Sequence, residues 1–221
     1  MRYKKKLSHI IIVCFLLFLL LSFLSVYNQL KRIDGFLIDW FLAITPNNAI
    51  IWFEYITMIG AGEPILLLTL GLILLLLYKK HYSEVVLFLS VTFGGLLLNL
   101  FLKMTFQRER PGEMHVIDVF GYSLEIASYS FPSGHTMRSV LLFSLLIYIS
   151  HSSLKRTDWK ITITSLSILA IILVSISRIV VGAHFPSDIF AAIFAAIGWF
   201  TFCIMINENI LSLLKYRLRV T

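Results

Sequence analysis

Three short segments of the sequence carry most of the residues that could do chemistry. They span residues 103–111, 131–138 and 177–188, and they hold two histidines, several cations and an aspartate in a chain with few charges. Lysine and arginine side chains suit a ligand with several anionic oxygens, because arginine offers planar, bidentate hydrogen-bond donors. We therefore expect a phosphate site where the three segments come together.

The residues expected to bind phosphate come from all three segments. Each is a cation or a small residue: Lys103, Arg110, Ser133, Gly134 and Arg178. Ser133 and Gly134 precede an apolar run, and the free N–H groups at the start of a helix bind anions, while a glycine allows close backbone approach. Arg108 is interpreted as a loop residue or substrate contact and Arg138 as a phosphate or headgroup contact, both outside the catalytic set.

Two histidines supply the remaining roles of a phosphoryl transfer. His184 is followed four residues later by Asp188, close enough for the carboxylate to hold one ring N–H and leave the other nitrogen free to attack. His135 follows the Ser-Gly turn, where a protonated imidazole can give its proton to the leaving oxygen. We predict that His184 is the nucleophile and His135 the general acid. No residue set has convincing metal-ligand spacing, so we expect neither a metal nor another cofactor.

The elements that must position these residues are long apolar helices. Of the 221 residues, 58% are hydrophobic and 14% charged, and the mean hydropathy is +0.88. A soluble domain carries about 25% charged residues. About 20 helical residues cross a hydrocarbon core about 30 Å thick. The uncharged runs predict an all-α, integral membrane bundle of six spanning helices in a single domain over residues 1–221, at about 7–28, 60–78, 84–102, 134–152, 160–180 and 187–207.

The connections between the spans differ in character. Residues 31–62 mix aromatic and acidic side chains, which predicts short interfacial helices, broken at residues 46–48 and 60–62, that could roof or gate the site. The connection from about Lys103 to Ser133 is long and dense in charge, and long loops in compact proteins are usually functional.

The basic residues behind the net charge of +7 are distributed unequally between the two sides of the membrane. With the N-terminus in the cytoplasm, twelve of the 19 basic residues fall inside and seven outside, as the positive-inside rule expects. The basic charge therefore requires no nucleic acid. We predict a multi-pass protein of the cell membrane with both termini cytoplasmic, the site facing outside, and no obligatory protein partner.

The three segments, taken together, resemble the three-part signature of the type 2 phosphatidic acid phosphatase superfamily: Lys103-x6-Arg110-Pro111, Pro132-Ser133-Gly134-His135 and Ser177-Arg178-x5-His184-x3-Asp188. The resemblance implies a phosphohistidine on His184 held by Asp188, His135 as acid and base, and the cations around the phosphate without a metal. The superfamily also includes membrane glucose-6-phosphatases and soluble haloperoxidases, so the signature indicates the anion site better than the reaction.

The resemblance implies a membrane lipid phosphatase similar to phosphatidylglycerophosphatase B or undecaprenyl pyrophosphate phosphatases, and we expect it to act on a phosphate monoester or pyrophosphate at the outer leaflet. Lys103 and Arg178 are expected where their helices leave the hydrocarbon, so a lipid can enter sideways with its tail in the bilayer. Undecaprenyl pyrophosphate, phosphatidylglycerophosphate and phosphatidate all fit. Two alternatives stay open: a transporter or binding protein for a lipid phosphate, and a phosphatase for a soluble sugar phosphate. An oriented histidine favours hydrolysis over binding.

Overall fold

The computed structural model describes residues 2–111, 117–119, 122–124 and 129–220, and these are mostly helical. The helices are α1 (Arg2–Val26), α2 (Lys31–Ile44), the 3-10 turn η1 (Asn47–Ala49), α3 (Ile50–Met58), α4 (Gly62–Tyr78), α5 (Tyr82–Phe106), α6 (Gly134–Ser153), α7 (Thr157–Val180) and α8 (Pro186–Val220). Two short strands, β1 (Ile117–Val119) and β2 (Tyr122–Leu124), pair antiparallel in the long connection after α5. The predicted all-α class is confirmed, with this small hairpin added.

Among the residues that the structure describes, five helical stretches are long and apolar enough to cross a membrane: Tyr3–Val26, Asn47–Tyr78, Tyr82–Phe106, Thr157–Val180 and Pro186–Asn209. The second stretch is interrupted at Ala61, whose ψ of 161° is extended, so α4 is its spanning part. The sixth predicted span, α6, is not among the five. Its 20 residues suffice at about 1.5 Å per residue, but its first turns carry His135 and Arg138. The polar groups of the site make this helix less apolar than the others.

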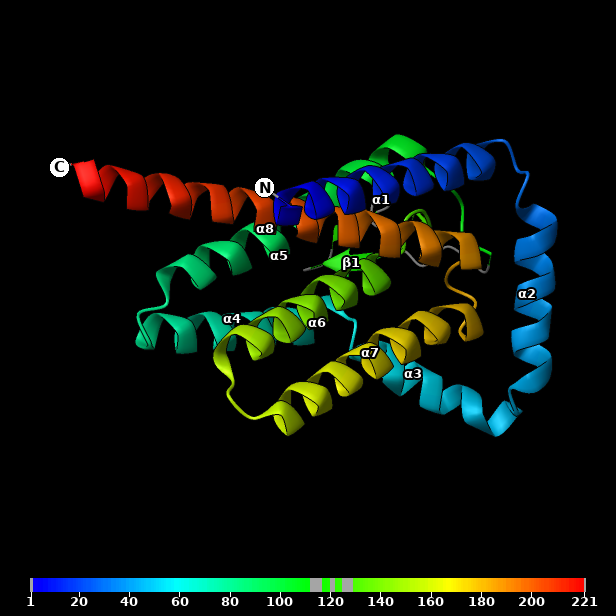
Figure 1. The fold of residues 1–221 in the computed structure, drawn as a ribbon. Coiled ribbons are helices and arrows are strands. Elements are labelled where there is room, and N and C mark those ends of the chain that lie inside the picture. Colours follow the sequence, from blue (N-terminus) through cyan, green and yellow to red (C-terminus); the bar gives the residue numbers. More distant parts are fainter. Residues whose placement is uncertain (1, 112–116, 120–121, 125–128, 221) are drawn as a thin grey trace.

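The helix α2 crosses the ends of the spanning helices at the end of the bundle away from the N- and C-termini (Figure 1). It packs against α7 and α8, and α3 follows it after Pro46 and η1. Short helices between the first two spans, with breaks at the Pro-Asn and Gly-Ala positions, are thus confirmed. They lie at the end where α7 turns into α8.

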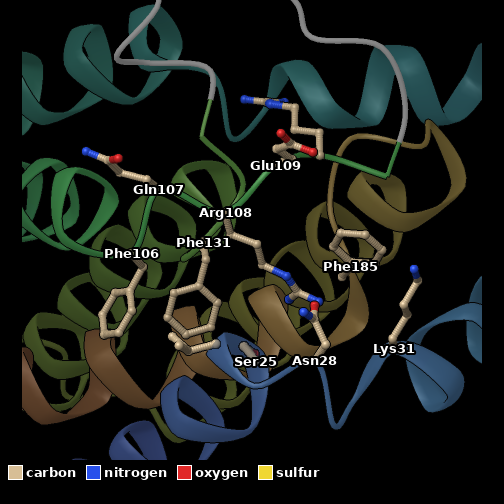
Figure 2. Close-up of a pocket in the computed structure, with 11 residues that line it drawn as sticks. Ser25, Asn28, Lys31, Phe106, Gln107, Arg108, Glu109, Phe131 and Phe185 are labelled. Atoms are coloured by element: carbon tan, nitrogen blue, oxygen red, sulfur yellow. The ribbon is translucent and has the colours of Figure 1, made fainter.

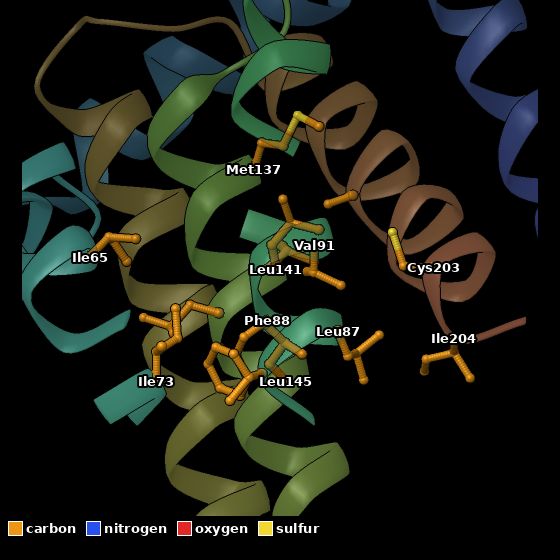
Figure 3. Close-up of a cluster of buried hydrophobic side chains, with 14 of the residues drawn as sticks. Ile65, Ile73, Leu87, Phe88, Val91, Met137, Leu141, Leu145, Cys203 and Ile204 are labelled. Carbon is orange, nitrogen blue, oxygen red and sulfur yellow. The ribbon is translucent and has the colours of Figure 1, made fainter. Parts of the chain in front are cut away.

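The core of the bundle holds α5 and α6 together (Figure 3). Met137, Leu141 and Leu145 follow one another at four-residue spacing on α6, which places them on one face. They pack with Phe88 and Val91 of α5, and none of these five side chains is more than 2% exposed. In a lipid environment such contacts stabilise helix pairs through van der Waals packing. This packing holds α5 against α6, and nearer the end of α5 the Asn99 Nδ2 donates to the Pro132 carbonyl, just before α6, at 3.3 Å.

Candidate active site

Four helix ends meet on the same side of the bundle and bring the three segments together. Lys103 lies in the last turn of α5, and Ser133 is the N-cap residue of α6. Arg178 lies in the last turn of α7, and Asp188 lies in the first turn of α8. The structure places all eight residues predicted from the sequence in this region: Lys103, Arg110, Ser133, Gly134, His135, Arg178, His184 and Asp188.

The start of α6 is tied directly to the start of α8. The Ser133 hydroxyl caps the helix by accepting a hydrogen bond from the Thr136 N–H at 3.5 Å. The backbone N–H of Ser133 donates to the carbonyl of Asp188 at 3.2 Å. A side-chain oxygen at the N-cap satisfies one of the free donors of a helix start. The remaining N–H groups of this turn are available to an anion.

Gly134 is the point where α6 approaches the cations of the site. A Cβ atom added at this position would lie 3.2 Å from Asn99 Oδ1, 3.3 Å from Arg138 Nη1 and 3.8 Å from Lys103 Cε. The first two distances are tighter than ordinary carbon contacts. Glycine therefore permits this spacing of Lys103 and Arg138, and a larger residue would have to displace one of its neighbours.

The cations are largely buried and carry unused donor capacity. Lys103 is 7% exposed and donates from Nζ to the Tyr129 carbonyl. Arg178 is 8% exposed and donates from Nη1 to Thr57 Oγ1 at 2.7 Å, while its Nε is buried with no hydrogen-bond partner among the described residues. Leaving a buried donor unsatisfied is costly. An anionic ligand at this point would satisfy it.

Arg110 joins the cation cluster from the loop after α5. Its Nη1 lies 3.5 Å from the Ala183 carbonyl, next to His184 in sequence. Burial lowers the pKa of the Arg110 guanidinium, and the Asp188 carboxylate offsets part of that change. An arginine stays protonated in proteins, so Arg110 keeps its positive charge at the site.

The imidazole of His184 is fully enclosed and held on its Nδ1 side. That nitrogen lies 3.6 Å from Asp188 Oδ2 and 3.3 Å from Ser130 Oγ. Ser130 Oγ also donates to Asp188 Oδ2, which accepts the Phe185 N–H at 2.9 Å as well. In the described part of the chain, Nε2 of His184 makes no hydrogen bond. The arrangement holds one ring nitrogen and leaves the other available.

The protonation state of His184 suits a nucleophile. Burial lowers the pKa of this histidine from 6.5 to about 3, and the Asp188 carboxylate opposes part of the shift. At neutral pH the ring is therefore uncharged. A neutral imidazole has a free lone pair on one nitrogen, as nucleophilic attack requires.

His135 lies in the first turn of α6, directly after Gly134. Its Nδ1 is 3.5 Å from Arg138 Nη2, and Arg138 in turn donates to the Gly60 carbonyl at 3.2 and 3.3 Å. Arg178 and His184 both lie within electrostatic range of His135. The position is compatible with proton transfer at the cluster, and the role of His135 as the acid stays a prediction.

Some residues that contact the site lie outside the expected set. Arg108 lies in the loop after α5, as one reading of the sequence expected, and its guanidinium forms an ion pair with Asp188 at 2.6 Å. Asp34, Thr57 and Gly60 come from the segment between α1 and α4. Asp34 offers a weak sequence signal as an acidic residue in an apolar stretch, and Gly60 belongs to the expected break at residues 60–62. Nothing in the sequence marks Thr57 or indicates that Gly60 contacts the site.

No three histidine, cysteine, aspartate or glutamate side chains come together as metal ligands within the residues that the structure describes. The described side chains at the site offer cations that can bind an anion, the neutral imidazole of His184 and a second imidazole at His135. The expectation of a site without a cofactor stays a prediction.

Comparison with known proteins identifies the family. The model of the PAP2 superfamily matches residues 84–211. Lipid A 1-phosphatase of Rhizobium etli is 34% identical over 118 residues, which are 52% of this chain and 46% of that protein. Phosphatidylglycerophosphatase B of Bacillus subtilis is 31% identical over 137 residues, 61% of this chain and 57% of that protein. The chain thus spans about half the length of the curated relatives it matches.

Two solved structures share the fold. The crystal structure of a transmembrane PAP2 type phosphatidylglycerolphosphate phosphatase from Bacillus subtilis has a TM-score of 0.75 and 24% identity, over 90% of this chain and 96% of that one. LpxE from Aquifex aeolicus has a TM-score of 0.54 and 22% identity, over 78% of this chain and 93% of that one. The family match covers more than half of the chain and contains all three motif segments. The chain belongs to the PAP2 superfamily, as its three-part signature predicted.

Proposed function

We propose that this protein is a membrane phosphatase that hydrolyses a phosphate monoester or pyrophosphate of a lipid. One observation carries the proposal: a buried, neutral His184, held beside Asp188, lies in a cluster of cations in which Arg178 Nε has no partner among the described residues. Binding alone needs the cations but not an oriented, uncharged imidazole. Phosphoryl transfer needs both.

In the proposed reaction, the lone pair of His184 Nε2 attacks phosphorus, and the bond to the lipid oxygen breaks. His135 gives its proton to that oxygen, so the lipid leaves as an alcohol or as a phosphate. Water then attacks the phosphohistidine and gives a proton to His135, which releases inorganic phosphate and restores His184. Lys103, Arg110 and Arg178, with the N–H groups at the start of α6, stabilise the charge on the phosphoryl oxygens. No step uses a metal.

A cavity of about 630 Å³ between α4, α5 and α6 supports a lipid substrate. Its walls are mostly apolar, with Leu66 and Phe93 among the lining residues, and it is bordered by Arg138. Arg138 reaches His135 at 3.5 Å, so the apolar cavity and the cation cluster share a side chain. An acyl or prenyl chain in this cavity would keep its phosphate next to the cations.

The proposed orientation places the termini in the cytoplasm and the site at the outer leaflet of the cell membrane. The site lies at the α2 end of the bundle, and both termini lie at the other end (Figure 1). The positive-inside rule assigns the end that carries more basic residues to the cytoplasm, and the basic N- and C-terminal segments favour this assignment.

A phosphate-release panel tests the function. Purified protein in detergent is given phosphatidate, phosphatidylglycerophosphate, undecaprenyl pyrophosphate, lipid A and glucose 6-phosphate, with His184→Ala as the matched inactive variant. We expect release from at least one lipid, and none with His184→Ala at an unchanged melting temperature. Release from glucose 6-phosphate alone would contradict the lipid substrate. Normal turnover by His184→Ala would refute the nucleophile.

A further inference from the structure

A buried aspartate on α2 lies against the site although it belongs to none of the three motif segments. Asp34 is only 2% exposed. Its Oδ1 accepts a hydrogen bond from the Ser187 backbone N–H at 2.9 Å, and its Oδ2 accepts one from the Ser187 hydroxyl at 2.6 Å. Ser187 immediately precedes Asp188 in the first turn of α8. Asp34 thus holds the start of the helix that carries Asp188.

The guanidinium of Arg108 joins Asp34 to Asp188. Nη2 lies 2.9 Å from Asp34 Oδ2, and Nη1 lies 2.6 Å from Asp188 Oδ1. The group sits 4.1 Å from the centroid of the Phe185 ring, and the side chain extends between Phe131 and Phe185 on one side of a cavity of about 460 Å³ (Figure 2). A planar guanidinium can hold two carboxylates at fixed angles, whereas a lysine ammonium cannot.

The charges of these three groups give Asp34 an electrostatic role in addition to its contacts. Arg108 alone would neutralise Asp188, but the charge of Asp34 balances Arg108, so these three groups together carry one net negative charge beside His184. The carboxylates of Asp34 and Asp188 are 2% and 0% exposed, so solvent screens the interaction little. When the ring gains positive charge on bonding to phosphorus, this negative charge stabilises it.

We propose that Asp34 and Arg108 are positioning residues, which act on His184 by fixing the geometry and the charge of Asp188. The inference rests on the proposed function, because it assigns the attack on phosphorus to His184. Asp34 makes no contact with Lys103 or Arg178 among the described residues. Removal of its charge should therefore slow the reaction at His184 and leave phosphate binding intact.

The test replaces Asp34 by asparagine, which keeps the shape and removes the charge. Asp39→Asn is the matched control, because Asp39 is an exposed aspartate on the same helix. We expect Asp34→Asn to lower kcat for phosphate release about ten- to hundredfold, with KM and the vanadate inhibition constant changed by less than about twofold. Asp39→Asn should match the unmodified protein. An unchanged kcat, or a loss confined to vanadate binding, would overturn the proposal.

A double-variant cycle examines whether the two residues act as one unit. Arg108→Gln should lower kcat, and combining it with Asp34→Asn should add little, because residues that act through one carboxylate are not additive. If the loss of kcat in the double variant equals the product of the two single losses, the two residues act independently and the proposal is overturned. Should Asp34→Asn fail to fold, Arg108→Lys carries the test, since it keeps the charge and loses the planar fork. A normal kcat in Arg108→Lys would contradict the inference.

A measurement that needs no turnover separates this inference from the proposed function. The NMR nitrogen shifts of the His184 ring, assigned by comparison with His184→Gln, report which nitrogen carries the proton. We expect the proton on Nδ1 in the unmodified protein and in Asp39→Asn, and a mixture of tautomers in Asp34→Asn. Absence of lipid hydrolysis by the unmodified protein would refute the function alone. An unchanged tautomer in Asp34→Asn would refute the positioning role.

Discussion

Replacing Gly134 by alanine should weaken activity without weakening the fold. The added methyl group would lie 3.2 Å from Asn99 Oδ1 and 3.3 Å from Arg138 Nη1, so these groups must move by a few tenths of an ångström. A misplacement of about 1 Å in an active site can cost about a hundredfold in rate, and we expect about a tenfold loss in kcat/KM for this smaller shift. Alanine is also a better helix former than glycine by up to about 1 kcal/mol, which offsets the crowding.

The assay compares kcat/KM for phosphate release, the vanadate inhibition constant and the melting temperature. Gly71→Ala is the matched control, because a Cβ atom at Gly71 of α4 would meet nothing within 4 Å. Gly134→Ala should lose activity and vanadate affinity at a normal melting temperature, whereas Gly71→Ala should keep all three. Full activity and full vanadate affinity in Gly134→Ala would refute the view that α6 and its neighbouring cations form the phosphate site.

Two further predictions concern protonation and sidedness. Because the pKa of His184 is lowered to about 3, its ring should remain neutral at pH 5, where an ordinary histidine is mostly charged; an NMR titration with a midpoint near 6.5 would contradict the burial argument. Single cysteines at Gln107 and Glu109, both exposed in the loop after α5, should react with an impermeant maleimide added to intact cells. Protection of both until the cells are lysed would reverse the proposed orientation.

The helical frame could be predicted from the sequence because a membrane excludes charge from most of each span. The end of a helix is harder to predict where a charge faces protein instead of lipid. The uncharged run ends at residue 102, and α5 continues through Lys103 to Phe106. Lys103 is buried, and its ammonium contacts the Tyr129 carbonyl. A charged residue that marks the end of an uncharged run can therefore lie within the helix.

The motif residues could be found because each group is compact in sequence. Their supporting contacts could not, because the partners are far apart along the chain. Asp34 and Arg108 are separated by 74 positions, and Thr57 and Arg178 by 121. Neither a spacing rule nor a hydropathy pattern relates such pairs. The structure is needed to show that α2 and α3 reach the site at all.

These distant contacts explain how a cluster of cations can exist before a substrate neutralises it. Arg138 and Arg178 lie close enough to repel each other, and Arg108 lies beside Asp188. Each of the three is hydrogen-bonded to a group from the segment between α1 and α4. Arg108 pairs with Asp34, Arg138 donates to the Gly60 carbonyl, and Arg178 donates to Thr57. A site whose donors are held in place before binding loses less energy to reorganisation during the reaction. The segment between α1 and α4 therefore holds three arginines in position at the site.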